Sequence, residues 1–453
     1  MFTLQEIIFK TLINYYFMKK LFFFIVLIGS ISGYSQIIND TISSKKLGET
    51  RSITISVPES YKSDPKKTYP LLVLLDGDYL LNPFLGVLKY GNYWDDLPET
   101  IIVSVNQNIK EERFEDCDWN DIGLLTPKSA KFLEFINTEL VATMTKKYRL
   151  NNFKIIAGHD LTAGYIHYFL GKETLFNGYI SLSPEFSPGM QKKIVERLAA
   201  SKQRIFYYQS SADGDTNKMK EGIKVLDVAL KSAPNANLIY KFDEIQNASH
   251  YSMVVKSIPN ALYFFFEGFQ PISNGEYQEK ILTLTEGFAA YYSKRSENLE
   301  KAFGSKIKIR LSDLKIIESA IVRNKAYNEY EPLAVLANQS FPKAMLGEYY
   351  MAQYYERKDD IKRAVKSYLT AFQMEEIGDY TKQMMMDKSQ SFREQLKKEK
   401  DIEKSKVKGK NGKVEETPAE AVPAESTPTD TIPSTDTPAA PTETKPADPK
   451  QNN

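Results

Sequence analysis

The stretch FKIIAGHDLTAGYIHYFLG, residues 153–171, places a short apolar run, a tight turn and a helix start in one line. The run of residues 153–157 predicts a strand that is buried on both faces. Apolar side chains at helical spacing follow the turn, at Leu161, Tyr165, Tyr168 and Phe169. Strand, turn and helix in this order predict a nucleophile elbow, where a strained turn holds a reactive side chain beside free backbone N–H groups.

The turn departs from the usual elbow pattern, G-x-S-x-G. Asp160 stands in place of the serine, and Thr162 stands in place of the last glycine. A serine attacks an ester after a histidine removes its proton. A carboxylate that attacked an ester carbonyl would give an anhydride, which reverts. Asp160 has a plainer role available as a helix cap, worth about 1 kcal/mol. We also expect that losing the glycine relaxes the turn.

Strand and helix patterns alternate over residues 36–270. The predicted strands lie at residues 51–57, 71–75, 101–105, 153–157, 179–182, 204–209 and 237–245. The predicted helices lie at residues 129–150, 161–169, 218–232 and 254–269. The charged residues 109–128 predict a surface loop. This alternation predicts an α/β fold with a mostly parallel sheet and helices on both faces.

Only helical periodicity appears over residues 271–396. In residues 351–372 the positions of a 34-residue tetratricopeptide repeat are partly met, with Ala364, Tyr368 and Ala371 at the small-aromatic-small positions. An ordinary helical bundle is the alternative. Residues 397–453 are rich first in Lys and then in Pro, Thr and Glu, which predicts a disordered tail because no core can form there.

The N-terminal segment predicts export. MKKLFFFIVLIGSISGYSQ begins at Met18 with two lysines and ends in small residues. This pattern predicts a signal peptide cleaved between Ser35 and Gln36, with Met18 as the true start of translation and residues 1–17 as an upstream extension. We expect a periplasmic or extracellular protein with no stable membrane span after cleavage. An uncleaved membrane anchor is the alternative.

Composition excludes several classes of site. The chain has 453 residues and a net charge of +1, so charge gives no indication of nucleic-acid binding. One cysteine and three histidines offer little material for a metal centre. We therefore expect neither metal nor cofactor.

Four segments in order resemble the putative-esterase branch of the α/β-hydrolases, which includes enterochelin-esterase-like and esterase D-like proteins. The segments are RSITISVPESYKSDPKKTYPLLVLLDGDYL, KFLEFINTELVATMTKKYRLNNFKIIAGHDL, FNGYISLSPEF and the region around His250. The resemblance covers residues 51–269 and implies the α/β-hydrolase fold. Over both its α/β part and its helical region, the chain resembles exported members of this branch that carry a tetratricopeptide-like helical extension.

The resemblance also implies site residues. The nucleophile position falls on Asp160, the base on His250, and the acid on Asp213 or Asp215. The oxyanion-hole N–H groups would come from Leu161 and from Gly77 or Asp78. Related hydrolases with an elbow aspartate attack carbon rather than a carbonyl, but they carry Trp where this chain has Leu161.

Two classes of function follow from these residues. In the first, the chain is a pseudoenzyme whose cleft binds a small ester-like ligand and whose helical region binds a protein partner. In the second, it is an active hydrolase that cleaves an ester, uses Asp160 on a carbon electrophile, or works through His250 and an aspartate without a covalent intermediate. A third hypothesis makes the helical region the working part on an inert hydrolase platform.

Overall fold

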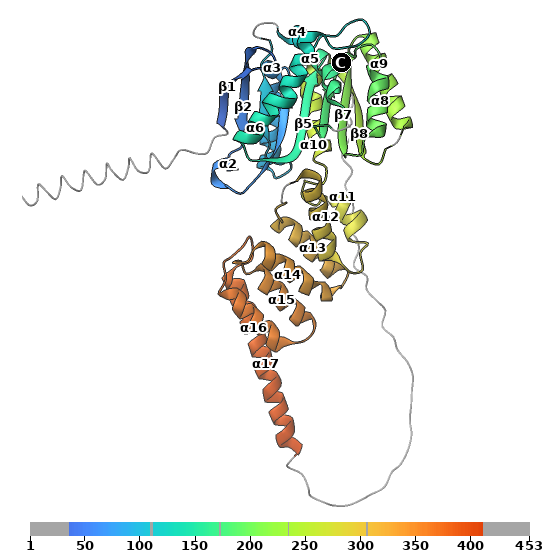
Figure 1. Cartoon of the computed structure of the whole chain (residues 1–453). Helices are drawn as coiled ribbons and strands as arrows, with labels where there is room; N and C mark the ends of the chain where they lie inside the picture. The colour runs from blue at the N-terminus through green and yellow to red at the C-terminus, as the bar shows by residue number, and fades with distance from the viewer. Residues whose placement is uncertain (1–35, 109–111, 172–173, 234, 305–306, 411–453) are drawn as a thin grey trace, which may run out of the picture. The chain divides into compact units, whose positions relative to one another are not determined.

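The computed structural model describes residues 36–108, 112–171, 174–233, 235–304 and 307–410 (Figure 1). The predicted signal peptide and residues 411–453 of the predicted tail lie outside these residues. The first strand begins at Gln36, the first of the described residues. Among the described residues, no helix combines the length and apolarity needed to cross a membrane.

The described residues form one eight-stranded sheet in the order β1-β2-β4-β3-β5-β6-β7-β8. Strands β1 and β2 pair antiparallel, as do β2 and β4, and all other pairs are parallel. The mostly parallel sheet predicted from the sequence is therefore confirmed. The strands are β1 (Gln36–Ser44), β2 (Glu49–Val57), β3 (Tyr69–Leu74), β4 (Ile101–Val105), β5 (Leu150–His159), β6 (Gly178–Leu182), β7 (Ile205–Gly214) and β8 (Leu238–Ser249).

Helices cover both faces of the sheet (Figure 1). Between the strands lie α2 (Ser60–Ser63), α3 (Gly77–Tyr93), α4 (Glu112–Asp116), α5 (Pro127–Glu134), η1 (Phe135–Leu140), α6 (Val141–Lys147), α7 (Leu161–Tyr165), η2 (Ile166–Phe169), α8 (Met190–Ala200) and α9 (Asn217–Ser232). Helix α10 (Ser252–Phe265) follows the last strand.

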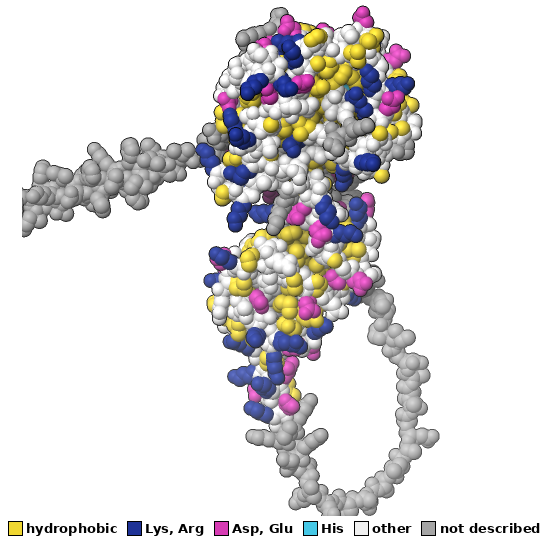
Figure 2. Space-filling view, in the orientation of Figure 1, with side chains coloured by type: hydrophobic (Ala, Val, Ile, Leu, Met, Phe, Trp, Pro, Cys, Tyr) yellow, Lys and Arg dark blue, Asp and Glu magenta, His cyan; other side chains and the backbone are white. Residues whose placement is uncertain are grey.

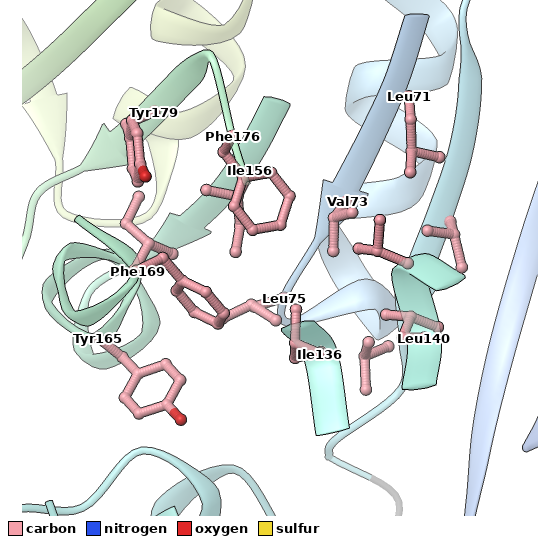
Figure 3. Close-up of a cluster of buried hydrophobic side chains, with 14 of the residues drawn as sticks. Leu71, Val73, Leu75, Ile136, Leu140, Ile156, Tyr165, Phe169, Phe176 and Tyr179 are labelled. Carbon is pink, nitrogen blue, oxygen red and sulfur yellow. The ribbon is translucent and has the colours of Figure 1, made fainter. Parts of the chain in front are cut away.

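Successive strand residues point to opposite faces, so the sheet separates two cores. Leu71, Val73 and Leu75 join the first core, whereas Leu72 and Leu74 join the second. Figure 3 shows the first core, where β3 side chains meet those of η1, β5 and β6 and those of the elbow helices α7 and η2. The elbow helices are thus held in place by apolar burial.

The prediction of a surface loop at residues 109–128 is wrong in part. These residues include α4, and Arg113, Asp116 and Cys117 are buried. Asp116 binds the fully buried Arg51 through two hydrogen bonds of 2.5 and 2.7 Å. Charges normally indicate a surface, but here they pair with charges from distant segments and become buried.

The chain after α10 is helical, as expected for residues 271–396. Its elements are α11 (Asn274–Glu276), η3 (Tyr277–Ile281), α12 (Phe288–Phe303), α13 (Leu311–Arg323), η4 (Tyr327–Glu329), α14 (Tyr330–Ser340), α15 (Leu346–Arg357), α16 (Ile361–Phe372) and α17 (Lys382–Lys410). The prediction of a disordered tail is wrong for residues 397–410, which continue helix α17. Ala364, Tyr368 and Ala371, which the repeat pattern singles out, are buried in the core of this region. The tetratricopeptide assignment itself stays a prediction.

Helix α12 contributes to the second core of the sheet. The Phe303 ring lies 5.2 Å from that of Phe153 on β5 and 5.3 Å from that of Phe266, centroid to centroid. Leu299 belongs to the same cluster. The α/β core is therefore completed by a helix from the helical region.

Candidate functional site

The elbow keeps its strained backbone. Strand β5 ends at His159 and α7 begins at Leu161, so Asp160 alone makes the turn, with φ 60° and ψ −118°. A non-glycine residue in this conformation costs about 1–3 kcal/mol and persists only where its surroundings hold it there. A Cβ on Gly164 would lie 1.7 Å from the Glu185 carbonyl oxygen. The expectation that losing the glycine at Thr162 relaxes the turn is wrong, because neighbouring contacts still fix it.

The Asp160 side chain does not cap the helix. No hydrogen bond joins its carboxylate to the N–H groups that follow. At this φ and ψ the side chain leaves the helix axis, and its oxygens lie 3.3 Å from Arg113 Nη2 and 3.8 Å from His250 Nε2. The helix-cap interpretation is therefore wrong, and Asp160 faces charged groups.

His250 and Asp215 form the contact that the resemblance implies for a base and its acid. Asp215 directly follows β7 and His250 directly follows β8, and the two strands are parallel neighbours. His250 Nδ1 lies 2.7 Å from Asp215 Oδ1. Asp215 Oδ2 accepts hydrogen bonds from the Ser183 hydroxyl at 2.6 Å and the Ala212 N–H at 2.8 Å.

The other candidate acid, Asp213, has a different partner from His250. Its carboxylate accepts a hydrogen bond from the Asn247 N–H at 2.5 Å and holds the turn at the end of β8. Of the two acids that the sequence left open, Asp215 is the one in contact with His250.

Electrostatics favour a charged His250. Its pKa is raised, first by the hydrogen bond to Asp215 and then by the nearby Asp160 charge, against the opposing effect of burial. For Asp215, burial alone would raise the pKa, but hydrogen bonds from His250, Ser183 and Ala212 outweigh burial and lower it. Both neighbouring carboxylates therefore stabilise the protonated form of His250.

A buried network beneath Asp160 was missed by the sequence analysis. Asp76, at the end of β3, accepts hydrogen bonds from Arg113 Nε at 2.6 Å, the Thr162 hydroxyl at 2.6 Å and the Tyr79 hydroxyl at 2.9 Å. Burial raises the pKa of Asp76, and Arg113 opposes this effect. Arg113 thus bridges Asp76 and Asp160.

One signal could have found Asp76: it directly follows a buried strand, on the edge where parallel strands place functional groups. Arg113 could not be identified as a site residue from the sequence, because a charged residue in an irregular segment normally lies on the surface.

The predicted oxyanion-hole residues begin two helices. Leu161 starts α7 and Gly77 starts α3, and the first N–H groups of a helix have no partner within it. The Thr162–Asp76 hydrogen bond ties these two helix starts together. The Asp78 carboxylate is turned toward the N–H groups of Gln107 and Asn108, at 2.9 and 3.0 Å.

His159 fixes the orientation of the site. Its ring lies 4.6 Å from the His250 ring, centroid to centroid, and its Nδ1 lies 3.1 Å from the Tyr79 hydroxyl. Burial, and next the charge of His250, lower the pKa of His159 to about 4. A neutral His159 therefore supports a charged His250 without competing for its proton.

This arrangement lacks the proton that serine chemistry starts from. A serine hydroxyl would give its proton to His250, whereas the residue at this position has no hydroxyl group. Asp160 instead forms charge pairs with Arg113 and His250. Among the described residues, no group of His, Cys, Asp and Glu is arranged to hold a metal ion.

Comparisons with known proteins agree with this fold. Residues 44–239 match the model of the family described as "Putative esterase". An uncharacterised protein from Capnocytophaga ochracea is 26% identical, with a TM-score of 0.72, and the match covers 79% of this chain and 99% of that one. That share exceeds the α/β part alone, so the likeness extends into the helical region.

A second solved structure shares the fold. The IroE-like serine hydrolase from Shewanella oneidensis is 17% identical with a TM-score of 0.51, over 79% of this chain and all of that one. No curated protein matches the chain. The chain therefore has an α/β-hydrolase fold, and its residues 44–239 are similar to the putative esterase family.

Proposed function

We propose that this chain is an exported protein of the esterase fold that has lost serine-esterase activity and binds a ligand in its cleft. The helical region binds a protein partner, so that the whole chain acts as a binding or scaffold subunit. The signal-peptide pattern at Met18 supports export.

One observation carries the loss of esterase activity. The nucleophile position holds a carboxylate that is paired with Arg113 at 3.3 Å and lies 3.8 Å from His250 Nε2. His250 would have to lose its proton to act as a base, and both carboxylates beside it oppose that loss. The negative charge of Asp160 also repels the oxyanion that ester hydrolysis must form.

Ester hydrolysis gives the direct test. We expect the purified protein to turn over neither p-nitrophenyl acetate nor p-nitrophenyl butyrate, and a fluorophosphonate probe to leave it unlabelled. The His250→Ala variant is the matched control for contaminating esterases. Turnover by the wild type that disappears in His250→Ala would overturn the proposal.

A second function has one observation in its favour, the preserved strain at Asp160. Strained turns persist where the reaction needs them, and the His250–Asp215 contact is preserved as well. In this alternative Asp160 attacks a carbon electrophile. The new carbon–oxygen bond forms as the carbon–halogen or epoxide bond breaks, and water activated by His250 then hydrolyses the ester.

Trapping the ester separates the two functions. After incubation of the His250→Ala variant with haloalkanes or epoxides, the alternative expects a mass increase on the peptide that contains Asp160. The binding proposal expects no adduct and no turnover by the wild type.

The role of the helical region is tested with a shortened chain. A chain that ends at Gly304 keeps Leu299 and Phe303 of the second core but uncovers Phe288 and Tyr292 of α12, so circular dichroism first checks that it is folded. We expect full-length protein to capture a partner that this shorter chain does not. Equal capture by both would assign the binding to the α/β part.

A further inference from the structure

A hollow of about 490 Å³ opens beside the elbow. Three segments line it: α4 with the loop after it, the first residue of α7, and the loop after β6. The lining side chains are Phe114, Glu115, Asp118, Trp119, Leu161 and Glu185. Because Leu161 directly follows Asp160, this hollow adjoins the nucleophile position.

The charged groups of the lining are all acidic. Glu115 is paired with Lys128 at 3.5 Å. Asp118 accepts a hydrogen bond from the Trp119 N–H at 2.8 Å, but neither Asp118 nor Glu185 makes a salt bridge within the described part of the chain. The guanidinium of Arg113 lies 5.7 Å from the centroid of the Phe114 ring and is paired with Asp76 and Asp160. Two carboxylates of the hollow, those of Asp118 and Glu185, are therefore not balanced by a salt bridge.

The remaining lining is apolar and largely aromatic. Hydrophobic side chains reach the surface of the α/β part in patches between charged ones (Figure 2), and Phe114 is 63% exposed. Aromatic faces attract cations through the ring quadrupole, and neighbouring carboxylates add to that attraction. The same carboxylates repel an anionic ligand such as a free aromatic acid.

We propose that this hollow binds an organic cation, an alkylammonium or guanidinium group. The apolar stem lies against Leu161 and the rings of Phe114 and Trp119, and the charged head lies between Asp118 and Glu185. The inference rests on the proposed binding role of the cleft and names its ligand class. A free polyamine and a Lys or Arg side chain of a polypeptide share this chemistry.

Trp119 provides a reporter, because the chain has two tryptophans. The Trp94→Phe variant leaves Trp119 alone, and Trp94 lies at the end of α3, outside the lining. Its fluorescence is followed during titration with spermidine and with acetyl-Gly-Lys-Gly-amide. Acetyl-Gly-norleucine-Gly-amide has a similar stem without the charge and is the neutral control.

We expect both cations to change Trp119 fluorescence in a saturable, salt-sensitive manner, and the neutral peptide to have no effect. Tighter binding of spermidine would indicate a free amine as the source, and tighter binding of the peptide a polypeptide. In the Trp94→Phe background, Asp118→Asn with Glu185→Gln should weaken binding about ten-fold at low salt. Phe114→Leu should weaken it about three-fold, and Glu267→Gln, outside the lining, should leave it unchanged.

An absent response to both cations at about 10 mM, far above the affinity of a specific site, would overturn the inference. An equal response to the norleucine peptide would do the same. Hydrolysis of p-nitrophenyl acetate by the same sample is read separately. The two measurements are independent. A failure to bind cations would overturn only this inference, and esterase activity would overturn only the proposed loss of that activity.

Discussion

Asp160 combines a strained backbone with an ion-paired side chain. Two substitutions separate the effects of the backbone and of the side chain on stability. Its φ of 60° suits glycine, whereas its carboxylate contacts Arg113. Both Asp160→Gly and Asp160→Ala remove the carboxylate, but only glycine removes the strain. We expect Asp160→Gly to be more stable to urea than Asp160→Ala by about 1–2 kcal/mol. An alanine variant of equal or higher stability would show that the turn is unstrained.

Serine at the same position tests whether His250, Asp215 and the oxyanion-hole N–H groups are placed correctly for ester hydrolysis. In Asp160→Ser the hydroxyl would face His250, which is already held by Asp215 at 2.7 Å. We expect hydrolysis of p-nitrophenyl acetate to become detectable and a fluorophosphonate probe to label Ser at this position. The double variant Asp160→Ser/His250→Ala should lose both signals. A correctly folded but inactive Asp160→Ser variant would show that the oxyanion donors are misplaced.

The His250–Asp215 pair should appear in the pH dependence of stability. The folded-state pKa of His250 lies above its ordinary value of 6.5. Its stabilisation is therefore complete below pH 6.5 and is lost as pH rises through the folded-state pKa. Asp215→Asn removes the largest cause of the raised pKa, so NMR titration should show a lower His250 pKa and urea unfolding a flatter profile above pH 6.5. An unchanged pKa would contradict this contact.

At the scale of elements, Gly164 fixes the contact between α7 and the loop after β6. A Cβ there would lie 1.7 Å from the Glu185 carbonyl oxygen. We expect Gly164→Ala to lower the free energy of unfolding by about 2–4 kcal/mol, since backbone must move. Gly86→Ala is the matched control, because α3 leaves open space around Gly86 and alanine should stabilise the helix by up to about 1 kcal/mol. Thermal unfolding of both variants measures the difference.

The sequence predicted the elements whose burial follows a simple pattern. The runs at residues 71–75, 101–105 and 153–157 became central strands because a strand covered on both faces is mostly apolar. Helix α4 could not be predicted, since its charges are buried by partners such as Arg51 that lie far away in the sequence. The positions of Asp160 and His250 followed from the resemblance, which left the acid open between Asp213 and Asp215. The choice of Asp215 and the role of Arg113 depended on the three-dimensional fold.

At the scale of the whole molecule, the α/β core and the helical region share side chains. Phe303→Ala removes a ring that packs on Phe153 and Phe266, which should cost about 3–5 kcal/mol. Tryptophan fluorescence reports the α/β part through Trp94 and Trp119, and circular dichroism reports all helices. We expect both signals to shift together. The exposed Phe114→Ala should change stability by less than about 0.5 kcal/mol, and a Phe303→Ala variant with unshifted fluorescence would contradict the shared core.

The positive φ of residue 160 also bears on how the site could have changed over time. Glycine codons lie a single base change from aspartate codons and a single base change from two serine codons. A glycine at this turn relieves the strain, so a chain that carries it would fold at least as well as its neighbours. Serine and aspartate can therefore replace one another here through a folded, inactive intermediate, with no step at which the protein must lose its structure.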